Sequence, residues 1–243
     1  GLEPATVRRW FRRQHGLTFQ AYQRLYRLNM AFNHLQRGAT VTDAAFDSGY
    51  ESLSGFQDSF KAVFGVAPSQ SQHQQVIHFT RLDTPLGPMV ACATGQGICL
   101  LEFTDRRGLE TELQDLAQRL QATIVPAENP HFPALRTQLA EYFAGARREF
   151  TLPLHTPGSP FQQSVWQALQ TIPYGATRSY GQQAAALGKP EAVRAVAAAN
   201  GQNRVALLIP CHRVIGASGQ LTGYAGGLWR KQRLLALERG PAG

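Results

Sequence analysis

The sequence predicts a multidomain protein with an all-α segment, a small α/β segment and a third, mostly α segment. Helix-spaced apolar residues dominate up to residue 67, short strands between Gly/Pro turns follow, and helical patterns return after residue 131. A chain of 243 residues is long enough for more than one hydrophobic core. We therefore expect domains at 1–69, 79–155 and 156–243, with a polar linker at 70–78.

The first segment contains a helix, a glycine turn and a second helix. Apolar residues at helical spacing predict helices at 4–13, 18–36, 41–48 and 53–64. Ser52 or Ser54 could cap the last of them, and Gly49 and Gly65 stand where helices end. This outline is typical of a helix-turn-helix, whose second helix enters the major groove of DNA. An ordinary helical hairpin has similar spacing, so the pattern alone leaves both open.

The middle segment is expected to be a scaffold. Its pattern predicts short strands near 76–80, 88–92, 98–103 and 124–125. It also predicts helices at 109–120 and 132–144. Residues 79–150 carry 7 basic and 9 acidic residues, so the net charge is −2. Cys92 and Cys99 lie in apolar strands, where a cysteine is most often part of the core. His78, His131 and His155 are scattered, and we expect them at the surface or at caps rather than as ligands.

The last segment predicts a second helix-turn-helix outline and is strongly basic. Helices are expected at 160–170, 180–187 and 191–200, and the last of these is rich in alanine. Small side chains let a backbone approach a duplex closely, although they equally allow tight helix packing. Residues 151–243 carry 9 basic and 2 acidic residues, a net charge of +7, which indicates a phosphate polymer as partner. A solubilising face without a ligand is the alternative.

The run Val205–Ile215 carries the clearest chemical signal. Its five leading apolar residues predict a buried strand that Pro210 ends, and Cys211 follows beside His212 and Arg213. Positive charge and a proton acceptor beside a thiol favour a thiolate, which is the nucleophilic form of cysteine. Cys211 could equally be a small core residue.

Other classes of protein are disfavoured. No apolar run approaches the ~18 residues of a membrane span, and no signal peptide opens the sequence. The three cysteines form neither an even disulfide framework nor a CxxC pair, so we expect a reducing cytoplasm and no structural zinc. The sequence starts at Gly1 without a methionine, which favours a fragment or a processed chain.

Two stretches of residues 1–69 resemble AraC-type transcription regulators. VTDAAFDSGYESLSGFQDSFKAVFGVAPS is similar to the second helix-turn-helix of that family, and EPATVRRWFRRQHGLTFQAYQRLYRL to the recognition helix of the first unit and the linking helix. The first unit is expected to be truncated, because its first helix has no counterpart here. The resemblance implies DNA contacts from Arg8, Arg9, Arg12, Ser54 and Gln57. The arginines could equally be phosphate contacts or solvated charges.

Residues 160–238 resemble the active-site domain of O6-alkylguanine-DNA alkyltransferases. The motifs are PFQQSVWQALQTIPYGATRSYGQQAA, GKPEAVRAVAAANGQN and LLIPCHRVIGASGQLTGYAGGLWRKQRLLALE, of which PCHRV is highly specific. Together with the AraC-like region, the chain is similar to the Ada family of combined regulators and repair proteins, without their zinc domain. The resemblance implies a ribonuclease H-like fold for 79–155 and a winged-helix-like fold for 156–243.

The resemblance also implies a role for each residue around the thiol. Cys211 would accept the alkyl group, and His212 would relay the thiol proton toward Glu238. Tyr180 would donate a hydrogen bond to the departing base, and Asn203 would orient the site. From the residues alone, Glu238 could instead form a surface ion pair with its basic neighbours, and Tyr180 could be a helix-start aromatic.

The resemblance implies a second set of residues, which would hold the alkylated base after it has flipped out of the duplex. Arg194 would enter the stack and fill the gap that the base leaves. The loop residues Tyr224, Ala225 and Gly226 would form the wall of the base pocket. Many relatives carry serine at the position of Ala225, so the resemblance implies no side-chain hydrogen bond from this position to O6, although the backbone N–H could still donate.

The sequence therefore predicts a DNA repair protein that acts once. Its partner is double-stranded DNA that carries O6-alkylguanine or O4-alkylthymine, with promoter DNA for the AraC-like region. We expect a cytoplasmic, nucleoid-associated bacterial monomer without cofactor or metal. A damage-sensing transcription regulator without transfer activity is the first rival, and Cys211 argues against it. A cysteine hydrolase, which would turn over repeatedly, is the second.

Overall fold

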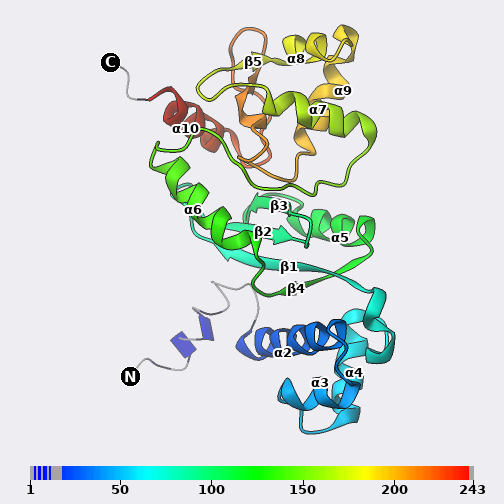
Figure 1. Ribbon diagram of the computed structural model, residues 1–243. Coiled ribbons are helices and arrows are strands. Elements are labelled where there is room, and N and C mark those ends of the chain that lie inside the picture. The colour runs from blue at the N-terminus through cyan, green and yellow to red at the C-terminus, as the bar shows by residue number, and fades with distance from the viewer. Residues whose placement is uncertain (1–2, 4, 7, 10, 12–17, 241–243) are drawn as a thin grey trace. The chain divides into compact units, whose positions relative to one another are not determined.

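The computed structural model describes residues 3, 5–6, 8–9, 11 and 18–240. Figure 1 shows the order of the elements along the chain. The chain forms two compact units, the first from residues 1–81 and 115–128 and the second from residues 82–114 and 129–243. Of the predicted DNA contacts, Arg12 lies outside the described residues.

The first unit contains the helices predicted at 18–36, 41–48 and 53–64 with defined caps, whereas the helix predicted at 4–13 falls partly outside the described residues. They are α2 (Phe19–Gln36), α3 (Val41–Asp47) and α4 (Leu53–Phe64). Thr18, Thr40 and Ser52 each accept a hydrogen bond from a first-turn amide, which stabilises the helix start. Ser52, rather than Ser54, is therefore the cap of α4. Gly65 ends α4 with φ 74°, a left-handed conformation that glycine adopts at little cost.

The core of the first unit is built on aromatic rings. Phe56, Phe60 and Phe64 recur at one face of α4 and are buried. The ring centroids of Phe56 and Phe60 are 5.5 Å apart and those of Phe60 and Phe64 are 4.4 Å apart, and Phe32 of α2 stacks on Phe64 at 5.1 Å.

Strand β1 (Gln75–Leu82) pairs in parallel with β4 (Ala122–Pro126). Residues 70–78 are more structured than a linker, because they contain the end of the 3-10 helix η1 (Pro68–His73) and the start of β1.

The second unit begins with a β-hairpin. Strands β2 (Met89–Ala93) and β3 (Ile98–Phe103) pair antiparallel, with Met89 opposite Phe103, and every residue of both is buried. Helix α6 (His131–Phe143) packs on β2, as Figure 1 shows. The boundary between the units passes through α5 (Leu109–Arg119).

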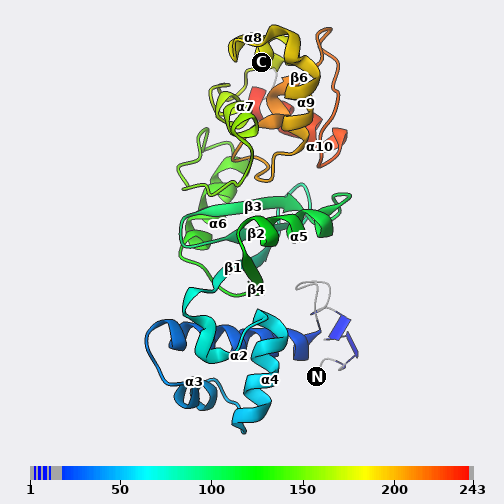
Figure 2. The same ribbon diagram turned by 90° about the vertical axis from the view of Figure 1, so that its right-hand side faces the viewer.

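The rest of the second unit is mostly helical. It contains α7 (Pro160–Gln170), β5 (Arg178–Ser179), α8 (Tyr180–Ala186), η2 (Pro190–Ala192), α9 (Val193–Gly201), η3 (Cys211–Arg213), β6 (Val214–Ile215) and α10 (Leu228–Arg239). Helices α7, α8 and α9 pack against one another (Figure 2). Gln183 of α8 and Asn200 of α9 exchange two buried side-chain hydrogen bonds, which fixes the pair. Among the described residues, no helix is long and apolar enough to cross a membrane.

One predicted strand is absent. Val205–Ile209 is buried as expected but forms turns, with one isolated bridge from Val205 to Leu101. The amide of Ile209 bonds to the carbonyl of Val205, which closes the turn. Leu207 has φ 71°, a conformation that no strand residue adopts. Apolar content predicted the burial of this segment correctly and its backbone wrongly.

Candidate active site

Cys211 stands at the start of a tight turn. The amide of Cys211 bonds to the carbonyl of Ile209 at 2.8 Å, and that of Arg213 to Pro210 at 3.0 Å. The resulting 3-10 helix lets Cys211 and His212 point in different directions while β6 continues beyond. Cys211 keeps part of its surface exposed, whereas His212 is fully buried.

Asn203 holds the loop and contacts the sulfur. Its Nδ2 lies 3.2 Å from Sγ of Cys211 and 2.8 Å from the carbonyl of Ile209. Its Oδ1 accepts from the amide of Val205 at 3.0 Å. One buried amide therefore ties both ends of the turn together and donates to the thiol.

Glu238 of α10 is a buried hub of hydrogen bonds. Its Oε1 lies 2.8 Å from Nε2 of His212 and accepts from the Tyr142 hydroxyl at 2.7 Å. Arg213 donates to both carboxylate oxygens at 2.9 Å, and the amide of Gly175 lies 3.2 Å from Oε2. Burial alone would raise the pKa of Glu238, but the hydrogen bonds from His212 and Arg213 overcome it and lower the pKa to about 2. Glu238 is therefore ionised, as a buried partner of His212 and not as a surface ion pair.

His212 is a neutral imidazole with one nitrogen engaged. Burial lowers its pKa, against the opposing effect of Glu238. Because Glu238 is ionised and acts only as an acceptor, Nε2 of His212 carries the proton. Nδ1 then keeps its lone pair, and it is buried without a hydrogen-bond partner among the described residues.

The expectation of a resting thiolate is wrong. Burial raises the pKa of Cys211 to about 11, and the hydrogen bond from Asn203 only partly opposes this. The charge that the sequence assigned to the thiol lies elsewhere, because the donors of Arg213 go to Glu238 and to the carbonyl of Ile172. The thiol is thus protonated at neutral pH and must lose its proton before it can attack a carbon.

Two predicted base contacts lie near the sulfur. The hydroxyl of Tyr180 donates to the carbonyl of Thr222 at 3.4 Å, and burial and Cys211 together raise its pKa. Burial raises the pKa of Tyr224 well above its ordinary value, with Cys211 as the next cause. The hydroxyl of Tyr224 is buried and has no hydrogen-bond partner in the described part of the chain. Ala225 is exposed and Gly226 is buried.

The other predicted contacts lie apart from the thiol or in the other unit. Arg194 is an exposed residue of α9. Ser54 and Gln57 are exposed on α4, and Arg8 and Arg9 are exposed near the start of the chain. Exposure is what a DNA contact requires, and it does not distinguish one from a solvated surface residue.

Sequence reasoning missed Lys231 and Tyr142. Lys231 is fully buried and donates to the carbonyls of Val214, Thr222 and Gly223, at 2.5, 2.6 and 3.2 Å. Burial lowers its pKa to about 8. It therefore ties the loop after β6 to β6 itself. A lysine in a basic run predicts a solvated side chain, so the sequence carried no signal for this role.

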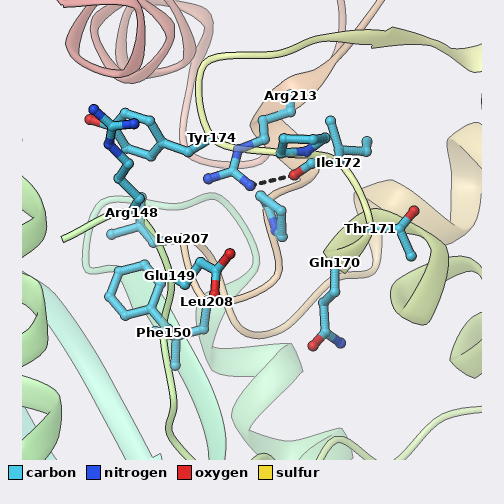
Figure 3. A pocket seen from close by; sticks show the side chains of 12 residues that line it. Arg148, Glu149, Phe150, Gln170, Thr171, Ile172, Tyr174, Leu207, Leu208 and Arg213 are labelled. Atoms are coloured by element: carbon cyan, nitrogen blue, oxygen red, sulfur yellow. Dashed lines mark hydrogen bonds between the residues drawn. The ribbon is translucent and has the colours of Figure 1, made fainter.

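Arg213 also lines a cavity of about 330 Å³ that is separate from the thiol. Figure 3 shows its guanidinium bonded to the carbonyl of Ile172, with Arg148 on the neighbouring ring of Tyr174. Both guanidinium carbons lie 5.8 Å from the centroid of that ring. Neither Cys211 nor His212 lines the cavity, so it is not where an electrophile would meet the sulfur. The described residues contain no group of His, Cys, Asp and Glu that could hold a metal ion.

Comparison with known proteins identifies three matched regions. Residues 160–240 match the DNA binding domain of 6-O-methylguanine DNA methyltransferase, and residues 77–156 match its ribonuclease-like domain. Residues 1–74 match a helix-turn-helix domain. The chain is thus multidomain, as the sequence predicted.

Individual relatives and a solved structure match the same regions of the chain. A methylated-DNA–protein-cysteine methyltransferase of Mycolicibacterium paratuberculosis is 48% identical over 68% of this chain and 93% of that protein. The bifunctional transcriptional activator/DNA repair enzyme Ada of Escherichia coli is 34% identical over 98% of this chain and 67% of Ada. The crystal structure of Mycobacterium tuberculosis OGT in complex with DNA matches with a TM-score of 0.58 and 44% identity, over 67% of this chain and 92% of that chain. The protein therefore belongs to the methylated-DNA–protein-cysteine methyltransferase family and shares the Ada arrangement of a helix-turn-helix region ahead of the methyltransferase.

Proposed function

We propose that this protein transfers the alkyl group of O6-alkylguanine, and also of O4-alkylthymine, in DNA to Cys211. The observation that carries the proposal is the arrangement around the thiol. A protonated Cys211 stands beside a neutral His212 whose Nδ1 has a free lone pair and whose Nε2 is bonded to ionised Glu238. This is the arrangement that a general base needs, because the imidazolium formed after proton uptake is stabilised by the carboxylate.

The transfer balances without a cofactor. His212 Nδ1 takes the thiol proton, through a bridging water, and the sulfur attacks the alkyl carbon. The C–S bond forms as the C–O bond breaks, and the electron pair of that bond stays on the guanine. Tyr180 donates a hydrogen bond to the departing base, which then takes up a proton. The thioether is stable to water, so each molecule acts once.

The alkylated base reaches the thiol by base flipping, in which the protein extrudes the nucleotide from the duplex. Extrusion costs a few kcal/mol, and Arg194 enters the gap from α9. The net charge of +7 over residues 151–243, from 9 basic and 2 acidic residues, supports a DNA-facing surface. For 79–155 and 156–243 we propose the ribonuclease H-like and winged-helix-like folds, joined through residues 70–78 to the regulator region at 1–69.

The helix-turn-helix of the first unit is proposed to bind promoter DNA. Exposed Ser54 and Gln57 on α4 would read bases, and exposed Arg8 and Arg9, with Arg12, would contact phosphates. We propose a monomeric, cytoplasmic protein that associates with the nucleoid.

The decisive experiment is stoichiometric. The full chain is incubated with an excess of duplex that contains one O6-methylguanine. The protein is then digested, and the mass of the peptide that contains Cys211 is measured by mass spectrometry. We expect a gain of one methyl group and one equivalent of repaired DNA per protein. No gain on that peptide would refute transfer to Cys211, and turnover beyond one equivalent would support a hydrolase instead.

Two variants separate binding from chemistry. Cys211→Ala should abolish transfer and retain DNA affinity, and transfer that survives would relocate the acceptor. Arg194→Ala should slow repair in duplex far more than reaction with the free alkylated base, whereas equal losses would contradict the intercalating role. The affinity for duplex should also fall steeply with salt as counterions are released.

A further inference from the structure

Arg230 of α10 makes contacts that the transfer step does not use. Nη1 donates to the carbonyl of Gly226 and Nε to the carbonyl of Leu86, both at 2.8 Å. Two more hydrogen bonds reach the carboxylate of Asp105, at 2.8 and 2.9 Å. The buried side chain of Arg230 therefore joins the proposed base-pocket wall to two segments of the scaffold. One is the turn before β2, at Leu86, and the other is the segment just after β3, at Asp105.

Gly226 is also confined by neighbouring aromatic rings. A Cβ at this position would lie 2.8 Å from the ring of Phe103 and 2.9 Å from that of Tyr224, both far inside normal contact. The guanidinium of Arg230 also lies over the Phe103 ring, 4.0 Å from its centroid, and 4.6 Å from that of Trp229. Phe103 and Tyr224 thus leave no room for a side chain at Gly226, while Arg230 holds its carbonyl.

Asp105 fixes the orientation of Arg230. A bidentate carboxylate–guanidinium pair sets the plane of the guanidinium and not only its charge. The hydrogen bond from Arg230 lowers the pKa of Asp105, so the carboxylate is ionised at neutral pH. The side chain of Asp105 is 64% exposed, so its replacement by a neutral amide leaves the packing around it intact.

We propose that Asp105 and Arg230 are positioning residues that set the affinity for the alkylated base by fixing the backbone of Tyr224–Gly226. The inference rests on the function proposed above. Ala225 has no hydroxyl, so this loop offers O6 a backbone N–H, and the strength of that hydrogen bond depends on where the backbone is held. Under this proposal, Asp105 and Arg230 make no direct contact with the base.

The test uses a free base, O6-benzylguanine, so that DNA binding does not enter. The rate at which the full chain is alkylated is followed against base concentration for wild type, Asp105→Asn and Arg230→Lys. Glu110→Gln, which also removes an exposed carboxylate from the second unit, is the matched control. Iodoacetamide, which needs no base pocket, reports the intrinsic reactivity of Cys211 in each variant.

We expect Asp105→Asn and Arg230→Lys each to raise the half-saturating concentration of the base by about tenfold, the usual effect of losing a charge-assisted hydrogen bond. The iodoacetamide rate and the control should stay at wild-type values. An unchanged half-saturating concentration in Asp105→Asn would overturn the inference, and so would an equal loss in the iodoacetamide reaction. If wild type reacts neither with the base nor with methylated duplex, the proposed function fails first and the inference fails with it.

Discussion

The second unit buries two glutamates and holds them in opposite charge states. Glu238 is 4% exposed and Glu102 is 2% exposed, so burial does not distinguish them. Yet the pKa of Glu238 is lowered to about 2, and burial raises that of Glu102 to about 8 although Arg106 opposes the rise. The number of donors around each carboxylate explains the contrast.

Glu238 receives hydrogen bonds from His212, Arg213, Tyr142 and the amide of Gly175. Glu102 contacts Arg106 at 3.3 Å, an arginine that it shares with Glu112, and its Oε2 has no hydrogen-bond partner among the described residues. Desolvation is the same kind of cost at both sites, and only the first site offsets it. This unit therefore concentrates its donors on the carboxylate that faces the imidazole, which is what a proton relay requires.

Glu238→Gln should cause the largest change. The amide cannot stabilise an imidazolium, so single-turnover transfer to Cys211 should slow by at least about 100-fold. Arg213 would be left buried without its counterion, and the free energy of unfolding should fall by about 3 kcal/mol. Quenched transfer assays and urea unfolding measure the two effects. A variant that transfers at the wild-type rate would remove Glu238 from the relay.

Arg213→Lys should have the next largest effect, because lysine keeps the charge and loses the bidentate geometry. We expect a loss of about 2 kcal/mol in stability. The pH dependence should change as well. A carboxyl with a lowered pKa adds stability above its ordinary value of 4.5, and this stability is lost as pH falls toward 2.

With fewer donors the pKa of Glu238 rises, so acid unfolding of Arg213→Lys should begin at a higher pH than in wild type. Arg233→Lys, an exposed position on the same helix, is the control. Acid titrations followed by circular dichroism would decide, and coincident curves for the two variants would contradict the role of Arg213.

Glu102→Gln should act in the opposite direction. A carboxyl with a raised pKa favours folding below its ordinary value of 4.5, and that contribution is lost as pH rises through about 8. The glutamine mimics the protonated form, so the variant should lack this alkaline loss and be more stable than wild type above pH 8, by on the order of 2 kcal/mol. Thermal unfolding across this pH range measures it, with Glu110→Gln as control. A loss of stability at high pH in Glu102→Gln would show that the ionised carboxylate is well paired.

The sequence predicted the elements whose signals are local. Helix α4 followed from a capping serine, three phenylalanines at helical spacing and a closing glycine, and β3 from a mostly apolar run between turns. The thiol, its histidine and Glu238 came from a family motif. The backbone of Val205–Ile209 could not be predicted, because a buried turn and a buried strand have the same apolar composition.

The charge states of Cys211 and Glu238 could not be predicted from the sequence, for a related reason. Whether Arg213 serves Cys211 or Glu238 depends on contacts between α10 and the η3 turn, which no local spacing records. Lys231 and Arg230 belong to a run that reads as a solvated basic face, yet both are buried. The assignment of a basic residue to a thiol therefore needs the fold as well as the motif.

Tyr142→Phe should cause the smallest change and so tests whether donors to Glu238 act additively. It removes one hydrogen bond of 2.7 Å and leaves those from His212, Arg213 and Gly175. Because the carboxylate keeps its other donors, we expect stability to fall by about 1 kcal/mol and transfer to change by less than about threefold. Urea unfolding and single-turnover transfer measure both. A loss of transfer as large as that of Glu238→Gln would mean that the Tyr142 hydroxyl, and not the number of donors, holds Glu238 in its charged state.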